Sequence, residues 1–151
     1  MRIRTSIKAI ISQNEHILFI RKQDQNGFYY LLPGGGQEHG ESMKDAIIRE
    51  CKEEVMVDVE VGEVCFVRDY ISRNHEFADY ENDFHQVEIM FNCCIKGNQK
   101  PQNGSNPDQG QLGVDWIAVD QMQNFRIYPK ELKRFLQENQ SKGKIYLGDV
   151  N

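Results

Sequence analysis

The segment from residue 35 to residue 57, GGQEHGESMKDAIIRECKEEVMV, constrains the fold of this chain more than any other stretch. Its first glycines predict a turn, and the residues that follow have the apolar spacing of an amphipathic helix over residues 42–55. Glu50, Glu53 and Glu54 stand three and four residues apart, a spacing that places side chains on one helical face. Carboxylates so arranged repel one another, whereas hard divalent cations bind carboxylate oxygens. The segment therefore predicts a helix with a metal-binding acidic face.

The adjoining face of this helix is apolar and is formed by Ile47, Ile48, Cys51 and Val55. We expect the helix to pack on a sheet through this face and to present its acids to a cleft. The alternative to a metal site is a solvent-exposed acidic stripe, which is what three glutamates on an arbitrary helix would form. The preceding Pro-Gly-Gly-Gly at residues 33–36 favours the metal site, because glycine permits positive φ and a close approach of the backbone to a ligand.

The composition is that of an ordinary globular protein, and we expect one domain over residues 1–151. The net charge of −5 argues against binding to polymeric nucleic acid, which requires a basic face. No apolar run is long enough for a signal peptide or a transmembrane helix, so we expect no membrane association. Cys51, Cys65, Cys93 and Cys94 lack CxxC spacing and a disulfide framework, and reduced thiols fit a cytoplasmic location.

Alternating apolar residues predict several strands and two helices. The expected strands are residues 3–11, 16–22, 29–32, 58–71 (one long strand or two short ones), 84–95 and 115–119. The second helix is expected to begin near Pro129, and the polar segment 96–111 is expected to be a mobile loop. Residues 144–151 read as a short strand or a tail. These elements predict an α/β or α+β domain with a mixed sheet.

Residues 35–57 resemble the signature of the Nudix (MutT-like) hydrolases: Gly, five residues, Glu, seven residues, Arg-Glu, an apolar residue, any residue, Glu-Glu, any residue, Gly and an apolar residue. The matching positions are Gly35, Glu41, Arg49, Glu50, Cys51, Glu53, Glu54 and Val57. The preceding Leu-Pro-Gly-Gly, with Tyr30 three residues before the proline, is also typical of the family. Met56 departs from the pattern, because the family has glycine there, and glycine favours a left-handed helix cap. The departure leaves the end of the helix open.

The resemblance implies an α/β/α sandwich with a mixed sheet and Mg²⁺- or Mn²⁺-dependent hydrolysis of a nucleoside diphosphate linked to another moiety. Four groups are implied to bind the metal: the side chains of Glu50, Glu53 and Glu54 and the carbonyl of Gly34. Arg49 and Glu41 are implied to hold these carboxylates in place. The backbone of Gly35 and Gly36 can reach metal and phosphate. A bound metal neutralises the diphosphate and acidifies water, and a carboxylate can remove the water's proton.

Several roles stay open at this point. The candidates for the general base are Glu50, Glu88 and the acids of the segment 79–83. The alternative for Glu88 is an exposed strand residue without a catalytic role. Arg21 either contacts phosphate or faces solvent, and Tyr30 either stacks on a base or packs in the core. Asp108 is the nearest carboxylate in the loop where some relatives carry another metal-binding acid.

The substrate class is also open. ADP-ribose-like sugar nucleotides and nucleoside triphosphates are the two leading substrate classes, and dinucleoside polyphosphates are a less favoured third class. Relatives that act on ADP-ribose often carry a proline about fifteen residues after the signature, and its absence from residues 70–74 weakens that option. A catalytically silent Nudix-like module that binds a nucleotide is the alternative to an enzyme, and a homodimer is an assembly that the sequence neither requires nor excludes.

Overall fold

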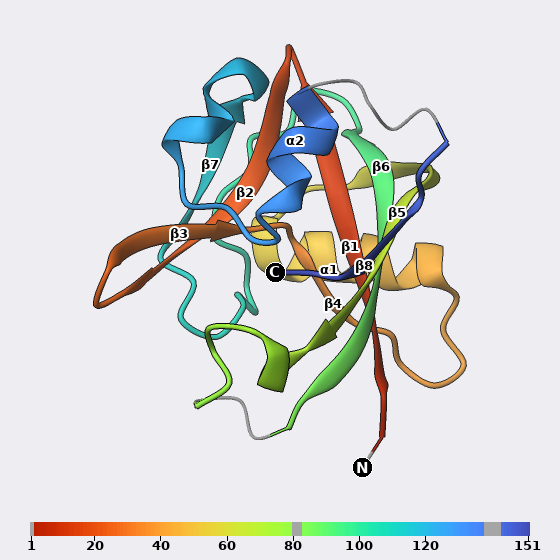
Figure 1. Cartoon of the computed structure of the whole chain (residues 1–151). Coiled ribbons are helices and arrows are strands. Elements are labelled where there is room, and N and C mark those ends of the chain that lie inside the picture. Colours follow the sequence, from red (N-terminus) through yellow and green to blue (C-terminus); the bar gives the residue numbers. More distant parts are fainter. Residues whose placement is uncertain (1, 80–82, 138–142) are drawn as a thin grey trace.

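The computed structural model describes residues 2–79, 83–137 and 143–151, which form mainly strands, with α-helices packed beside them (Figure 1). The strands are β1 (Arg4–Gln13), β2 (His16–Asp24), β3 (Gly27–Leu31), β4 (Gly34–Gly36), β5 (Val59–Ile71), β6 (His85–Ile95), β7 (Gly113–Ala118) and β8 (Tyr146–Asp149). The helices are α1 (Met43–Val55) and α2 (Glu131–Gln137), with short 3-10 helices at Ser72–Asn74 and Val119–Asn124. None of the helices in these three ranges is both long and apolar enough to cross a membrane.

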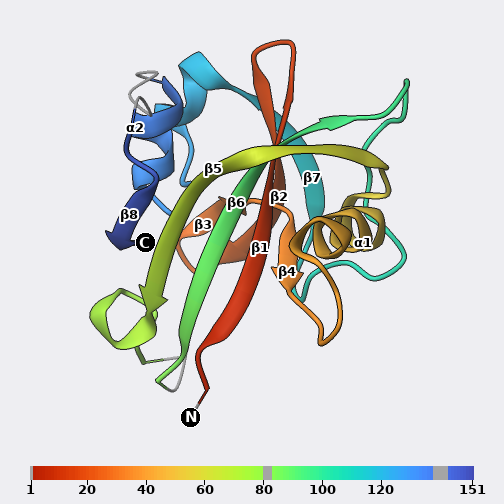
Figure 2. The same ribbon diagram turned by 90° about the vertical axis from the view of Figure 1, so that its right-hand side faces the viewer.

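The strands form one mixed sheet with β1 near its centre. Their hydrogen-bonded order is β3-β2-β1-β6-β5-β8, with β4 beside β1 and β7 beside β2. β1 runs parallel to β6, and β5 runs parallel to β8, whereas the other strand pairs are antiparallel. Helix α1 covers one face of the sheet and α2 lies on the opposite side (Figure 2). The expected α/β/α arrangement with a mixed sheet is therefore confirmed.

Two buried clusters hold the three layers together. In β1, Ile7, Ala9 and Ile11 belong to the cluster under α1, while Ile10 belongs to the cluster on the α2 side. This division follows from the alternation of side chains along a strand. Ser6 and Lys8 share the α2 side with Ile10, so that two polar side chains of a central strand face the interior between the layers.

The predicted elements are present, and three details differ from expectation. The segment from residue 58 forms one long strand, β5, with irregular pairing near Val64. Residues 34–36 form the short strand β4 rather than an open turn. Ile48 is 40% exposed, because Ile47 and Cys51 form the row of side chains that packs on the sheet, and Ile48 is rotated away from that row.

The polar segment 96–111 is held against the end of α1, although the sequence predicted a mobile loop. The backbone N–H groups of Gln102, Gly104 and Asn106 donate to the carbonyls of residues 55, 54 and 53, at 3.1, 3.0 and 3.0 Å. These carbonyls lack partners within the helix, because the last turn of any helix leaves them unpaired. The loop therefore acts as the cap of the helix that carries the acidic residues.

Candidate active site

Helix α1 begins and ends with defined caps that set the position of its acids. The Ser42 hydroxyl accepts a hydrogen bond from the Asp45 N–H at 3.1 Å, as expected for an N-cap residue. At the other end Met56 has φ 58° and ψ 35°, the left-handed conformation that glycine adopts more readily. The helix therefore ends where the signature predicts, and methionine adopts the cap conformation in place of glycine.

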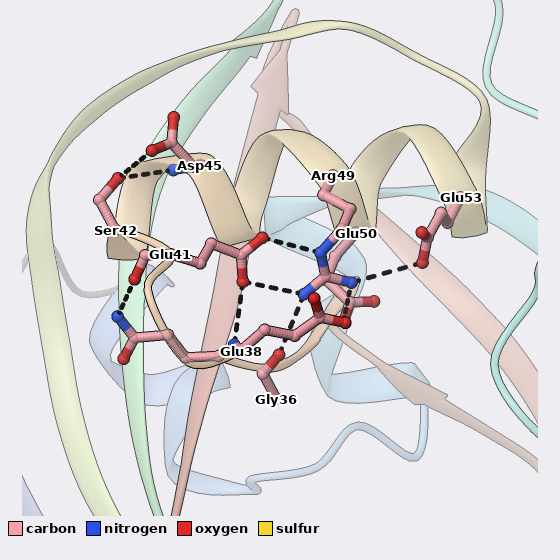
Figure 3. Close-up of polar contacts among 9 residues, drawn as sticks. Gly36, Glu38, Glu41, Ser42, Asp45, Arg49, Glu50 and Glu53 are labelled. Carbon is pink, nitrogen blue, oxygen red and sulfur yellow. Dashed lines mark hydrogen bonds and ion pairs between the residues drawn. The ribbon is translucent and has the colours of Figure 1, made fainter.

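Arg49 organises one side of the acidic face (Figure 3). Its Nε and Nη2 donate to both carboxylate oxygens of Glu41, at 2.8 and 3.1 Å, and Nη2 also donates to the Gly36 carbonyl at 3.1 Å. Its Nη1 lies 3.0 Å from Glu50 Oε1 and 3.4 Å from Glu53 Oε2. The hydrogen bonds from Arg49 hold the pKa of Glu41 below its usual value. One guanidinium thus fixes three carboxylates relative to the β4 backbone.

Glu54 occupies a different environment from the other two helix acids. Its side chain is buried, and Oε2 accepts a hydrogen bond from the Gly34 N–H at 2.9 Å. Burial, helped by the neighbouring charges of Asp108 and Glu50, raises the pKa of Glu54 to about 7, although the Lys8 ammonium and the Gly34 N–H oppose the rise. In the absence of a cation, the site therefore penalises the charged form of this carboxyl group.

The glycines of β4 let the backbone pass close to these acids. A Cβ atom on Gly35 would lie 2.5 Å from Glu50 Oε1, so any larger residue would displace that carboxylate. A Cβ atom on Gly34 would lie 2.1 Å from the Ile7 carbonyl oxygen, and Gly34 has a φ of +133°. Glycine is therefore required at both positions, for the site at one and for the sheet at the other.

The donor set fits a hard divalent cation. Within residues 2–79, 83–137 and 143–151, no three His, Cys, Asp or Glu side chains are already gathered around one point as metal ligands. The reason is visible in the contacts: Arg49 draws Glu50 and Glu53 toward itself, and the Gly34 amide holds Glu54. Carboxylate and carbonyl oxygens are the ligands that Mg²⁺ and Mn²⁺ prefer, and a cation would relieve the charge penalty at Glu54.

A cavity of about 880 Å³ extends from these acids across the inner face of the sheet, the face that carries Ser6 and Lys8 of β1. The signature residues Gly34, Gly35, Arg49, Glu50, Glu53 and Glu54 line one end. Ser6 and Lys8 of β1, Gln86 and Glu88 of β6, and Arg68 and Tyr70 of β5 line the floor. Strand register explains the floor, because Glu88 pairs with Ser6 on one side and with Arg68 on the other.

Glu88 lies in this floor and is buried rather than exposed. Arg68 Nε donates to Glu88 Oε2 in a buried ion pair, and Gln86 Nε2 donates to Oε1 at 3.1 Å. Arg68 also donates to the Val150 carbonyl, so that the end of the sheet at β8 closes this side of the cavity. The sequence predicted Glu88 on the polar face of its strand, but gave no sign of its partner on β5.

Two predicted binding residues lie away from the cavity. Arg21 pairs with Asp115 at 2.7 Å, and Tyr30 is 8% exposed and packs edge-to-face against Phe125 in the core. Neither of the two residues lines the cavity, whereas Lys22 and Tyr29, each one position away, do. The reason is the period of two along a strand: a displacement of one residue exchanges the two faces.

Aromatic side chains from three distant segments form a wall of the cavity. The ring of Tyr29 lies 6.5 Å from that of Phe77 and 6.1 Å from that of Tyr128, and the latter two lie 5.5 Å apart. Behind them, the Arg126 guanidinium lies over Tyr29 and Tyr128 and forms an ion pair with Asp24 at 2.6 Å. Sequence reasoning missed this wall, because no local pattern links the segments that build it.

The other candidate acids are placed as follows. Asp108 lines the cavity and pairs with Lys22 at 2.6 Å. Asp79 and Asp83 are exposed, and Glu81 lies outside the described residues.

His75 contacts Asp149 at 2.7 Å and His85 contacts Asp69 at 3.1 Å, so both histidines form polar contacts at the edge of the sheet.

Comparisons with known proteins agree with the geometry. A family model described as NUDIX domain matches residues 2–138. The chain is 25% identical to the Nudix hydrolase YvcI of Bacillus subtilis (strain 168), over 80% of this chain and 70% of that protein. It is 32% identical to the nucleoside triphosphatase NudI of Enterobacter sp. (strain 638), over 62% of this chain and 70% of that protein.

Among solved structures, a NUDIX hydrolase from Nitrosomonas europaea has the same fold. It superposes with a TM-score of 0.72 at 18% identity, covering 96% of this chain and 93% of that one. The match of the family model extends from β1 to the end of α2 and thus includes the whole acidic helix and most of the cavity floor. The chain therefore belongs to the Nudix family of hydrolases, enzymes that act on diphosphate bonds.

Proposed function

We propose that residues 1–151 form a single metal-dependent pyrophosphohydrolase domain that cleaves a nucleoside diphosphate linked to another moiety. Nucleoside triphosphates are the first choice of substrate, and ADP-sugars are the second. The observation that carries the proposal is the arrangement of Glu50, Glu53, Glu54 and the Gly34 backbone at one end of a single cavity. The likeness to a nucleoside triphosphatase supports the choice of substrate.

The chain's own residues would divide the work in a simple way. Four groups would hold Mg²⁺ or Mn²⁺: the carboxylates of Glu50, Glu53 and Glu54 and the Gly34 carbonyl. When bound, this ion neutralises the diphosphate and lowers the pKa of water. Arg49 and Glu41 keep the carboxylates oriented through the ion pairs described above. Gly35 and Gly36 leave room for the phosphate chain beside Glu50.

We assign the general base to Glu50 rather than to Glu88. Both oxygens of Glu88 accept hydrogen bonds, from Arg68 and Gln86, so both are already occupied by partners within the protein. Glu50 lies in the cavity beside the other groups that would hold the ion, Glu53, Glu54 and Gly34. Glu88 would instead bind the substrate, as part of the cavity floor.

The aromatic wall of the cavity suits the nucleoside. Tyr29 and Phe77 offer rings on which a base can stack, and Gln86 offers an amide for its edge. The exposed fraction of Tyr128 is only 3%, so its ring forms the fixed back of this wall.

We further propose a cytoplasmic location, supported by four cysteines that form no disulfide.

The test is a panel of nucleotides with Mg²⁺ or Mn²⁺ and detection of released phosphate or pyrophosphate. Glu53→Gln should lose most of the metal-dependent turnover, and removal of the metal with a chelator should abolish turnover in the wild type. Near-normal turnover by Glu53→Gln would refute the assignment of the site. Tight nucleotide binding under saturating metal, without release of phosphate or pyrophosphate, would instead support a catalytically silent module.

A further inference from the structure

Lys8 has an unusual position for a lysine. It lies on the inner face of the central strand β1, half-buried, and its nearest partners across the sheet are Gly34 of β4 and Met90 of β6. Its Nζ donates to the Gly34 carbonyl at 3.0 Å. The other peptide group of Gly34 is also held, because its N–H donates to Glu54 at 2.9 Å. Gly34 is thus fixed between an ammonium group and a carboxylate.

Lys8 differs from the neighbouring cations in its partner. Arg49, Arg68 and Lys22 also line the cavity, and each of them pairs with a carboxylate. The contact described for Lys8 is with a neutral carbonyl, which compensates its charge less than an ion pair would. An ammonium group so placed can change partners at a lower cost than Arg49, Arg68 or Lys22 can.

The carbonyl that Lys8 contacts is the one that the proposed function assigns to the metal. A divalent cation at this oxygen would lie next to the ammonium group, and two positive charges so close repel strongly in a partly buried site. The flexible lysine side chain allows Nζ to turn away. The cavity lies on the same side of the sheet and would hold the anionic diphosphate.

We propose that Lys8 exchanges partners during the reaction cycle. In the metal-free enzyme it binds the Gly34 carbonyl and offsets the charge of the acidic cluster. When the metal takes the carbonyl, Lys8 turns to the substrate and binds an oxygen of the diphosphate. Lys8 is therefore a phosphate-binding residue and also a competitor of the metal. This inference rests on the proposed function.

The exchange predicts effects of opposite sign in Lys8→Met, which removes the charge and keeps an apolar side chain of similar length. Isothermal titration should show that Mn²⁺ binds the nucleotide-free variant more tightly than the wild type. Inorganic pyrophosphate, titrated into the Mn²⁺-loaded protein, should bind at least about tenfold more weakly, as expected for the loss of a charge-assisted hydrogen bond. Lys8→Arg should restore much of the pyrophosphate affinity.

Lys44→Met is the matched control, because Lys44 is exposed on α1 and its loss changes the net charge equally. It should leave both affinities unchanged. Weaker or unchanged Mn²⁺ binding by Lys8→Met, or unchanged pyrophosphate binding, would overturn the exchange. Circular dichroism and thermal melting verify folding, and Lys8→Gln serves as the second variant, with the same two outcomes, if methionine prevents folding.

The two titrations need no turnover, so they separate this inference from the proposed hydrolase activity. A wild type that hydrolyses nucleotides, with Lys8→Met behaving as Lys44→Met does, would overturn the exchange and leave the hydrolase assignment intact. A wild type that binds Mn²⁺ but hydrolyses no nucleotide would refute the activity. The opposite changes in metal and pyrophosphate affinity would then still support the partner exchange at the Gly34 carbonyl.

Discussion

Replacing Glu54 by glutamine should stabilise the metal-free protein while weakening metal binding. The Glu54 side chain is 4% exposed, and burial raises its pKa from the ordinary value of 4.5 to about 7. The folded state therefore binds a proton that the unfolded state has already released between these pH values. The free energy of unfolding consequently falls as the pH rises through this window.

The size of the effect follows from the same two values. A pKa that rises from 4.5 to about 7 on folding costs about 3 kcal/mol once the group is charged in both states. The penalty is absent below pH 4.5 and complete above pH 7. Glutamine avoids it, and its side-chain oxygen can still accept the hydrogen bond from the Gly34 N–H. Glu54→Gln should thus be more stable than the wild type by up to about 3 kcal/mol at pH 8.

Urea denaturation with a chelator, at pH 4.5 and at pH 8, measures this difference. Added Mg²⁺ or Mn²⁺ should stabilise the wild type at pH 8 and have much less effect on the variant. Glu53→Gln is the control, because its side chain is 34% exposed and its replacement should change the free energy of unfolding by less than about 1 kcal/mol. A metal-free Glu54→Gln that is less stable than the wild type at pH 8 would refute the reasoning.

Three further substitutions test separate parts of the structure. Gly35→Ala should displace Glu50, whose Oε1 would lie 2.5 Å from the new Cβ, and lower Mn²⁺ affinity in a titration; unchanged affinity would contradict the close approach. Met56→Gly should raise the free energy of unfolding by about 0.5–1 kcal/mol in urea, because glycine adopts the left-handed cap without strain; a loss of stability would show that the methionine side chain matters more. Asp24→Asn should release Arg126 from its place behind the aromatic wall and raise KM for a nucleotide more than it lowers kcat, whereas an equal effect on both would argue against a binding role.

Much of the acidic end of the site could be predicted from the sequence because its geometry is local. The spacing of Glu50, Glu53 and Glu54 determines their common face on any α-helix, wherever that helix packs. The apolar row that includes Ile47 and Cys51 is equally local and is present as expected. Met56 shows the limit of this reasoning, because the residue type disfavours a conformation that the chain nevertheless adopts.

The rest of the cavity could not be predicted, because it depends on which strands become neighbours. Glu88 pairs with Arg68 in a buried ion pair because β5 lies beside β6 and its register, irregular near Val64, places Arg68 opposite Glu88. Tyr29 rather than Tyr30 reaches the cavity because β3 presents the face of Tyr29 there. A period of two tells which residues share a face, but not which face meets the site.

The sequence by itself determined the chemistry: an oxygen-rich acidic helix after a run of glycines, in the order that defines a Nudix hydrolase. Only the tertiary structure decided what surrounds that helix. It placed Lys8 on the carbonyl of Gly34, an aromatic wall along the same cavity, and a polar loop on the last carbonyls of α1. The physical reason is the range of the interactions, since helical spacing acts over three or four residues, whereas strand register and loop docking join segments that lie far apart in the chain.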